Sequence, residues 1–520
     1  MLGLCLAVFL TGMDQTILAT ATPVISDEFQ TIADLGWWTN GYLLTLSSFQ
    51  LFYGKLYSLF SIKIVYLVAI ALFEIGSLVC TTAPNSAALV IGRAIAGLGA
   101  AGIFSGGILI TTKTIPLARR AAYLGIMSGV FGVAAILGPF IGGGLIDSTT
   151  WRWCFGINLP LGVITVIICA LLVKTPVQPE IEGFTTAQKL RQLDIPGTVL
   201  MVAGLICLLM ALQWGGSTYS WNDSRIISLF VVAAVLGIAF GAFQTLSRFS
   251  TTIPPAVARN RDVWFAATYA MSITGGVYTA ILYLPIWFQT VRDYSALSSG
   301  TMLTPLIGGY VACSVIAGAI TMAVGYYNPG MILGTLLAIS GSALLTTIDT
   351  SSSTARVIGY QLLCMYGFGV GFAFGQPSYV VQTVLPPPDV PIGVTLITLV
   401  QNLSASVFVA VAQSIFQDKL RSHLEAMDLP VSINISSTGA AQIADAVPPE
   451  FRDRVVKGLS ESLVTTFYIS LSLSCASVIG AVGTRWRSMK EGGTRKTEET
   501  ALADGNSEQH HTGEALAERK

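Results

Sequence analysis

Long apolar segments recur along the whole chain and constrain its fold more than any other feature. We count fourteen of them, each close to the roughly 20 residues that a helix needs to cross a bilayer. They cover residues 2–22, 37–58, 64–83, 87–111, 122–146, 155–174, 195–214, 226–246, 263–287, 300–325, 330–348, 356–379, 392–416 and 462–483. Only 11% of the residues are charged, against about 25% in an average soluble domain. This composition excludes a soluble enzyme, a disordered chain and a secreted disulfide scaffold, and it predicts an all-α polytopic membrane protein.

The distribution of basic residues predicts how the chain is oriented. An even number of spans puts both termini on the same side of the membrane. With the termini in the cytosol, the short inner loops contain eleven Lys or Arg residues and the short outer loops contain four. Basic residues are enriched in cytosolic loops, so we expect both termini to be cytosolic. The sequons at Asn222 and Asn434 then fall in outer loops and are candidate glycosylation sites.

Few residues are available for metal, redox or nucleotide chemistry. The eight cysteines form no CxxC pair, and the three histidines lie in polar segments. The chain contains no GxxxxGK-S/T phosphate loop. We therefore expect no metal and no cofactor, and any uphill transport would have to draw on an ion gradient or on the ATPase of a partner. The 28 basic residues balance the 28 acidic ones, so charge gives no sign of a nucleic-acid partner.

A glycine-rich run from Gly125 to Gly144 reads GIMSGVFGVAAILGPFIGGG. Glycines four residues apart lie on one face of a helix and let a second backbone approach closely. A proline in this run removes a backbone hydrogen bond and can bend the helix. Ordinary packing of small residues is the competing interpretation, but Gly-Pro followed by Gly-Gly is more specific than a single GxxxG. The residues of this motif are Gly125, Gly129, Gly138, Pro139, Gly142 and Gly143.

This run resembles the fifth-helix antiporter motif of the major facilitator superfamily. The stretch from Trp151 to Gly162 resembles the WRWxFxINxPxG pattern of its fourteen-helix drug:proton antiporter family. The residues around Asp14 and around Arg93 resemble the first-helix and fourth-helix motifs of the same family. The resemblance extends to about residue 485 and is greatest for fungal members that export toxins and secondary metabolites.

The loop between the second and third segments departs from the superfamily pattern. Gly54, Leu56 and Lys63 match the loop signature. Ser58 and Ser61 stand where the family has an aspartate and a second glycine. The resemblance implies that this aspartate joins a charge relay at the cytosolic face, so the gating role of that relay is in doubt for this chain.

The resemblance implies a major facilitator fold of two six-helix bundles plus two inserted helices. We place the N-terminal bundle at 1–174, the linkers and inserted helices at 175–254, and the C-terminal bundle at 255–486 with an outer loop at 417–461. Residues 487–520 are rich in charge and predict a disordered cytosolic tail. Transporters of this superfamily bind substrate near the membrane midplane, between the bundles, and alternate access by rocking.

Three ionisable residues fall deep within apolar segments: Asp14, Glu74 and Arg93. A charge at the middle of a membrane costs about 2.5–3.5 kcal/mol on insertion scales, so such residues pair or face water. We expect Arg93 to have a carboxylate partner or to face water, and Asp14 to take up a proton in one state of a transport cycle. Glu74 has two interpretations: it takes part in proton coupling, or it is structural and only neutralises Arg93.

Amide side chains within the spans are candidates for a substrate cavity. They are Asn40, Gln50, Gln289, Gln376, Gln401 and Asn402. With the aromatic residues Trp37, Trp38, Tyr42, Tyr283 and Trp287 they predict a mixed surface that suits a mid-sized amphiphile. The alternative for Trp37 and Trp38 is an interfacial belt at a helix end.

The function that these features favour is a proton-driven exporter of a small amphiphilic molecule, such as a toxin, drug or secondary metabolite. We expect a monomer in the plasma membrane, with a vacuolar or vesicular membrane as the alternative. Within transport, the alternative is a uniporter or an importer, such as a siderophore or amino-acid permease. A channel and a membrane enzyme fit less well, because the residues show neither a pore lining nor a nucleophile with its partners. A non-transporting membrane sensor is left open.

Overall fold

The computed structural model describes residues 1–32, 34–114, 117–172, 195–215, 219–246, 255–362, 366–386, 389–427 and 447–488. Within these ranges the regular structure is helical, apart from an isolated bridge between Gly215 and Tyr219. Lipid offers the backbone no hydrogen-bond partners, so each apolar segment satisfies its own N–H and C=O groups as a helix. The predicted all-α fold is confirmed.

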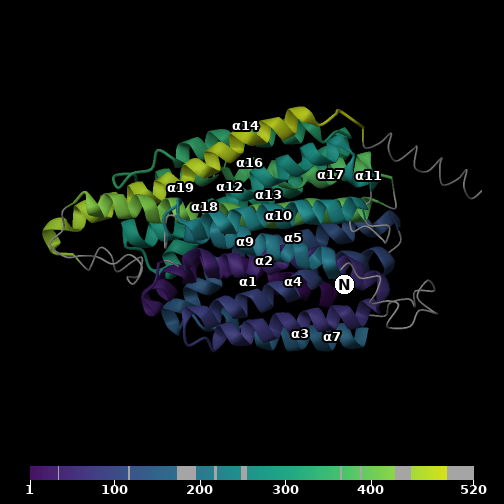
Figure 1. The fold of residues 1–520 in the computed structure, drawn as a ribbon, viewed down its shortest axis with the longest axis horizontal. Helices are drawn as coiled ribbons and strands as arrows, with labels where there is room; N and C mark the ends of the chain where they lie inside the picture. Colours follow the sequence, from purple (N-terminus) through teal and green to yellow (C-terminus); the bar gives the residue numbers. More distant parts are fainter. Residues whose placement is uncertain are drawn as a thin grey trace, which may run out of the picture.

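The first helices form one bundle, in the lower half of Figure 1. They are α1 (Leu2–Phe29), α2 (Leu35–Leu59), α3 (Ile62–Thr81), α4 (Ser86–Thr114), α5 (Leu117–Ser148), α6 (Trp153–Gly156) and α7 (Asn158–Leu172). In this N-terminal bundle α1 packs on α5 and α7, and α4 packs on both α2 and α3.

The last helices form a second bundle above it (Figure 1). They are α11 (Pro255–Ala258), α12 (Arg261–Arg292), α13 (Ala296–Val324), α14 (Asn328–Leu345), α15 (Thr354–Leu362), α16 (Tyr366–Phe374), α17 (Gln376–Val384), α18 (Val390–Glu425) and α19 (Pro449–Gly483). The predicted span at 356–379 is divided among α15, α16 and α17. The N-terminal and C-terminal bundles meet where α5 packs on α13, α2 on α18 and α1 on α12.

Two further helices, α9 (Ile195–Trp214) and α10 (Ser224–Leu246), lie between the bundles in sequence. The helix α9 packs against α2 and α18 and so contacts both bundles, whereas α10 packs mainly on α9. Only 6% of the most apolar stretch of α10 is buried, compared with 83% for α12. The inserted pair is therefore peripheral, and lipid is the natural neighbour of α10.

Each of the fourteen predicted segments coincides with a helix or a run of helices. Twelve spans among the described helices are long and apolar enough to cross a membrane, and α9 contains a shorter apolar helix. The helix α2 is absent from the twelve. Its polar residues include Asn40 and Gln50, which face the other bundle and lower its hydropathy.

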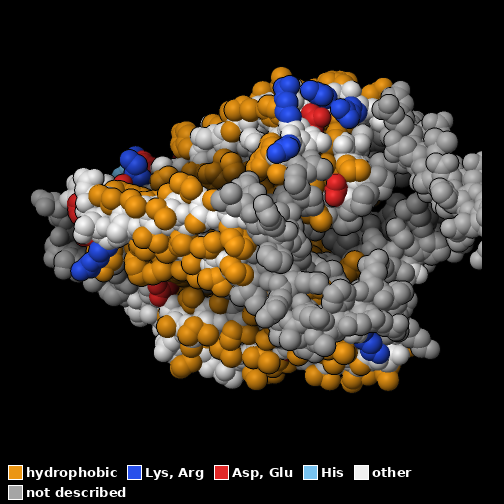
Figure 2. Space-filling view, turned by 45° about the vertical axis from the view of Figure 1, so that its right-hand side comes forward, with side chains coloured by type: hydrophobic (Ala, Val, Ile, Leu, Met, Phe, Trp, Pro, Cys, Tyr) orange, Lys and Arg blue, Asp and Glu red, His pale blue; other side chains and the backbone are white. Residues whose placement is uncertain are grey.

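The surface agrees with a membrane environment. Large apolar side chains are strongly exposed on peripheral helices, for example Leu171 (71%), Ile238 (73%) and Val482 (76%). Figure 2 shows hydrophobic side chains over broad areas of one face, with charged side chains mainly toward its margins. Exposed apolar area on this scale is typical of a lipid-facing surface.

The loop predicted at 417–461 is partly helical. The helix α18 continues to Glu425 and α19 begins at Pro449, and both project beyond the rest of the molecule at the left of Figure 1. His423 on α18 lies 3.2 Å from a carboxylate oxygen of Glu461 on α19. The two helices extend past their apolar runs because they pack on each other, which a prediction from hydropathy alone does not capture.

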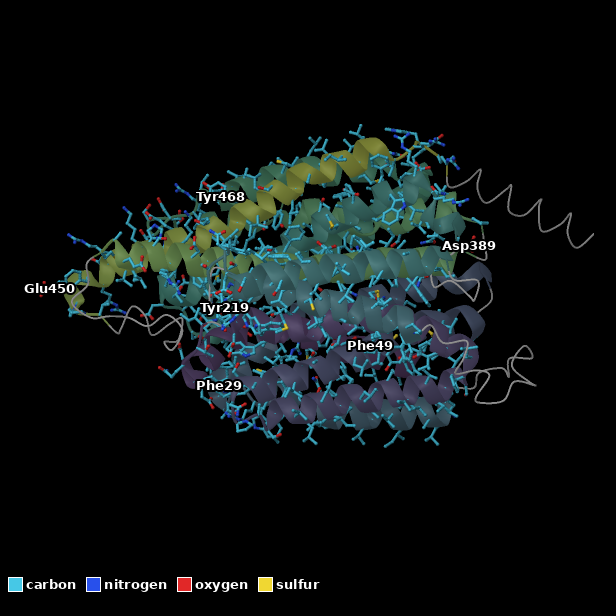
Figure 3. The ribbon with its side chains drawn as sticks, in the orientation of Figure 1. Phe29, Phe49, Tyr219, Asp389, Glu450 and Tyr468 are labelled. Atoms are coloured by element: carbon cyan, nitrogen blue, oxygen red, sulfur yellow. The ribbon has the colours of Figure 1, made fainter. Side chains whose placement is uncertain are left out.

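Two ends of the molecule serve as reference points below. The Phe29 end is where α1 finishes and where Glu450 also lies, and the Met1 end is where α1 begins and where Asp389 lies (Figure 3).

Candidate proton-coupling site

A buried ion pair joins α1 to α4 inside the N-terminal bundle. Arg93 Nη1 lies 2.6 Å from Asp14 Oδ2, and the two side chains are 2% and 1% exposed. Arg93 Nε also donates a hydrogen bond to the carbonyl oxygen of Trp38 at 3.0 Å. The guanidinium lies over the ring of Tyr42, 4.4 Å from its centroid. Arg93 thus has the carboxylate partner that its place in an apolar segment predicted.

The second oxygen of Asp14 is held by a residue that sequence reasoning did not select. Asn158 Nδ2 on α7 lies 3.3 Å from Asp14 Oδ1 and 3.2 Å from Ser77 Oγ on α3. One polar network therefore links α1, α3, α4 and α7. The signal for Asn158 was an amide within an apolar segment, in the stretch that resembles the drug:proton antiporter family.

Glu74 on α3 is placed differently from Asp14. Both carboxylate oxygens are buried without a hydrogen-bond partner in the described structure. The carboxylate rests on the backbone of α7, where a Cβ added at Gly162 would lie 1.9 Å from Glu74 Oε1. In the described part of the chain Glu74 forms no ion pair with Arg93. The hypothesis that Glu74 neutralises Arg93 is therefore not supported by a contact between them.

The glycine-rich run on α5 divides into two parts. A Cβ at Gly138 would lie 2.2 Å from Thr16 Oγ1, and one at Gly142 would lie 2.6 Å from Ile17 Cγ1, both on α1. At Gly129, by contrast, an added Cβ would meet no atom within 4 Å. The predicted close approach thus occurs at Gly138 and Gly142 and is wrong at Gly129, because Gly129 lies nine residues before Gly138 and therefore on the opposite face of α5.

Other residues of the same motif add to this arrangement. Gly143 is buried in the tightly packed part, whereas the surroundings of Gly125 lie outside the described part of the chain. The carbonyl oxygen of Pro139 would lie 2.5 Å from a Cβ added at Gly300 on α13. The motif therefore packs against α1 on one side and against the C-terminal bundle on the other.

The two loop-signature residues, Lys63 and Gly54, differ in their contacts. Lys63 Nζ donates a hydrogen bond to the carbonyl oxygen of Ala170 at 2.5 Å, in the last turn of α7. A cation at a helix C-terminus interacts favourably with the helix dipole. At Gly54 an added Cβ would meet no atom within 4 Å, so this glycine makes no close contact.

Three of the six amide candidates lie at the α2–α18 contact between the bundles. Asn402 Nδ2 lies 3.2 Å from Gln50 Oε1, and Ser406 Oγ lies 3.2 Å from Asn40 Oδ1. A fourth, Gln289, donates to Ser299 Oγ at 2.8 Å and to the carbonyl oxygen of Thr20 on α1 at 3.4 Å. These amides join the two bundles.

The remaining amides and most of the predicted aromatic residues lie within a bundle. Gln376 exchanges hydrogen bonds with Thr321, and Gln401 Nε2 donates to the carbonyl oxygen of Phe374 at 3.4 Å. Trp37 is half-buried. The other aromatic residues of the predicted surface are fully buried, and they are Trp38, Tyr42, Tyr283 and Trp287. The fully buried rings are core residues and do not line an accessible surface.

Toward the Phe29 end, hydrogen bonds close the contact between the bundles. Gln413 and Gln417 on α18 both donate to the carbonyl oxygen of Ile32, at 2.7 and 3.1 Å. Asp147 at the end of α5 accepts from the backbone N–H of Leu297 at 3.3 Å, in the first turn of α13.

Of the two sequons, Asn222 is exposed just before α10, and Asn434 lies outside the described residues.

Comparison with known proteins agrees with this architecture. The family model of the Major Facilitator Superfamily matches residues 4–409. The chain is 45% identical over 491 residues to a thioclapurine efflux transporter of Claviceps purpurea, covering 94% of this chain and 90% of that protein. It is 41% identical to the efflux pump aflT of Aspergillus parasiticus, over 94% of this chain and 95% of the pump.

A solved structure shows the same fold at low sequence identity. It is a bacterial homologue of the human lysosomal transporter Spinster, which is 16% identical and has a TM-score of 0.62 over 94% of this chain and 98% of that chain. The resemblance to fungal exporters and the predicted fold class are confirmed. The chain belongs to the major facilitator superfamily.

Proposed function

We propose that this multi-pass membrane transporter, which exports small molecules, is driven by proton antiport through the Asp14–Arg93 pair. The cargo is a small amphiphilic organic molecule such as a toxin, drug or secondary metabolite. The buried ion pair carries the proposal, because it places a protonatable carboxylate against a fixed cation inside the bundle. Relatives named as efflux pumps support the direction of transport.

Protonation of Asp14 changes the free energy of the N-terminal bundle by an amount comparable to that of a conformational switch. When one partner of a buried pair loses its charge, the other is left uncompensated, which costs about 3–5 kcal/mol. Moving a two-state equilibrium from 1:99 to 99:1 needs about 5.5 kcal/mol. One proton at this pair therefore supplies most of the free energy that a conformational switch needs.

The helix that carries Asp14 also contacts the other bundle. Gln15, the next residue, accepts a hydrogen bond from the hydroxyl of Tyr278 on α12 at 2.8 Å. Thr16 packs against Gly138 of the α5 motif, whose neighbour Pro139 contacts α13. A change in charge at Asp14 therefore acts on a helix whose next two residues contact α12 and α5.

The orientation follows from the basic residues. With both termini in the cytosol, the Phe29 end faces outward, and the hydrogen bonds of Gln413 and Gln417 close that end in this conformation. We assign the structure to the state in which substrate reaches the protein from the cytosol. The transporter works as a monomer in the plasma membrane, and the domain boundaries at 174, 254 and 486 separate its bundles, inserted helices and tail.

Purified protein in sealed vesicles tests the coupling. An imposed pH gradient should drive accumulation of compounds from a panel of small fungal metabolites, with measurable proton flux. Asp14→Asn should abolish accumulation while substrate exchange without a gradient partly remains. An Asp14→Asn protein that still concentrates substrate, with unchanged proton flux, would remove Asp14 from the mechanism. Wild-type transport that ignores a proton ionophore would favour the uniporter instead.

A further inference from the structure

Two aromatic pairs, one in each bundle, each include a residue of α5 or α13, the two helices that pack on each other where the bundles meet. Phe104 on α4 and Phe131 on α5 have ring centroids 5.8 Å apart at an interplanar angle of 64°. Tyr310 on α13 and Phe374 on α16 have centroids 5.2 Å apart at 70°. Both are edge-to-face pairs of the kind that aromatic side chains prefer.

A contact between the bundles lies beside one residue of each pair. A Cβ added at Gly132 would lie 2.5 Å from Val311 Cγ1, so the residues that follow Phe131 and Tyr310 are in contact. On α1, a Cβ at Gly12 would lie 2.9 Å from Phe131 Cδ2, one turn before Gln15.

Tyr278 on α12 connects the two sides. Its hydroxyl donates to Gln15 Oε1, and its ring packs against the apolar core cluster that both bundles share and against a second one mainly in the N-terminal bundle. The aromatic band is therefore defined as Phe104, Phe131, Gln15, Tyr278, Tyr310 and Phe374.

The residues of the aromatic band keep part of their surface accessible. All of them are half-buried, whereas the rings predicted from sequence, such as Trp38 and Tyr283, are fully buried. The helices α1 and α12 carry Gln15 and Tyr278 and are the most buried of the described spans, at 72% and 83%. Since these two residues bond to each other across the bundles, their accessible surface faces the interior and not lipid.

Charge within the band selects the class of ligand. None of its residues is charged near neutral pH. The adjacent Asp14 is 1% exposed and paired with Arg93. A charged ligand here would lose its hydration without gaining a counter-ion. Aromatic edges and faces favour a flat ring system, and the Gln15–Tyr278 pair offers one hydrogen-bonding group from each bundle.

We infer that the aromatic band binds uncharged, planar, polycyclic aromatic molecules that carry a hydrogen-bonding group. This inference deepens the proposed function, since it names the chemical class of the exported molecule. The ligand would lie between the aromatic pairs of the two bundles and would exchange with the Gln15–Tyr278 hydrogen bond. Binding would thus report on the contact between α1 and α12, next to Asp14.

A matched series of anthracene probes tests the inference. The protein in lipid nanodiscs, without a proton gradient, is titrated with 9-anthracenemethanol, 9-anthracenecarboxylate and 9-(aminomethyl)anthracene, and energy transfer from tryptophan is followed. The neutral alcohol should bind at least about tenfold more tightly than either charged probe, which corresponds to about 1.4 kcal/mol. Equal affinity for the three probes, or no binding of the alcohol, would overturn the inference.

Substitutions locate the binding. Phe131→Leu and Tyr310→Leu should each weaken the alcohol about tenfold, and Tyr278→Phe should weaken it less because the ring remains. Tyr468→Leu is the control, because that ring is 53% exposed on α19 near the edge of the molecule in Figure 3. Melting temperatures of all variants show whether the fold is kept. Loss of affinity in Tyr468→Leu alone would place the probe elsewhere and refute the band.

The Asp14→Asn variant separates this inference from the proposed function. It should bind the alcohol with near wild-type affinity while failing to accumulate substrate. If the neutral probe does not bind but wild-type vesicles show proton-driven efflux, the aromatic band is refuted and antiport stands. If the probe binds as expected but the ionophore has no effect on transport, antiport is refuted and the band stands.

Discussion

Asp14 and Glu74, the two carboxylates predicted deep within apolar segments of the N-terminal bundle, have opposite surroundings. Asp14 has a donor on each oxygen, Arg93 at 2.6 Å and Asn158 at 3.3 Å. Glu74 has none in the described structure, and its carboxylate lies against the backbone of Gly162. Hydropathy treats the two residues alike, since each is an acid in an apolar helix. The difference shows that the neighbouring side chains decide which acid has partners whose contacts change when it is protonated.

The energetic consequences of that difference are large. Removing one partner of a buried ion pair costs about 3–5 kcal/mol, because the other charge stays buried. Removing a carboxylate that accepts no hydrogen bond leaves no donor unsatisfied, so the cost is mainly that of changed packing. Substitutions around Asp14 should therefore disturb transport and stability far more than substitutions around Glu74.

The largest effect is expected for Arg93→Ala. It leaves Asp14 buried without its cation, so we expect loss of transport and a destabilisation of about 3–5 kcal/mol, measured as a lower melting temperature. Arg93→Lys should be milder, since the charge stays but the planar fork that also reaches Trp38 is lost.

The matched control is Arg152→Ala. Arg152 pairs with Glu28 at 2.7 Å, but the two side chains are 32% and 43% exposed. Exposed pairs contribute about 0–1 kcal/mol, so this variant should melt much closer to the wild type. Equal destabilisation by the two alanine variants would contradict the importance assigned to the buried pair.

A smaller effect is expected for Asn158→Leu. This change removes the donor to the second oxygen of Asp14 and the link to Ser77. Losing a partner of a buried polar group costs about 1–3 kcal/mol. We expect slower efflux that still depends on the pH gradient, because the Arg93 contact remains. If the variant has the efflux rate and the melting temperature of the wild type, the second contact of Asp14 is dispensable.

Gly162→Ala tests the position of Glu74 directly. The added Cβ would lie 1.9 Å from Glu74 Oε1, so the carboxylate must move. Overpacking of this kind costs about 1–3 kcal/mol, and the lower value is expected because the end of a flexible side chain can shift. The double variant Gly162→Ala with Glu74→Ala should recover part of the loss. Additive losses in this double-mutant cycle would place Glu74 away from Gly162.

The smallest effect is expected for Glu74→Gln. The amide has nearly the same shape, and no ion pair or hydrogen bond of the described structure is removed. Melting temperature, substrate transport and proton flux in vesicles should all remain close to the wild type. A reduced number of protons moved per substrate would instead assign Glu74 to the coupling machinery, as one of the two sequence interpretations holds.

The amino-acid sequence by itself determined the membrane class, the helical fold and the superfamily. Each of these depends on local properties. A run of apolar residues must form a helix in lipid, and a short motif such as the one around Gly138 and Pro139 can be recognised within a single segment. The pairing of Asp14 with Arg93 was also within reach, since a fixed cation in an apolar segment needs a partner.

Only the tertiary structure decided which residues share a site. Arg93 and Asn158 lie 79 and 144 positions from Asp14, so their contacts arise from the packing of four helices. The same packing brings α1 against Gly138 and places no atom close to Gly129. It also buries the rings of Trp38 and Tyr283 and leaves those of the aromatic band accessible. Helix periodicity shows which residues share a face, but the neighbour of that face is set by how helices distant in sequence fit together.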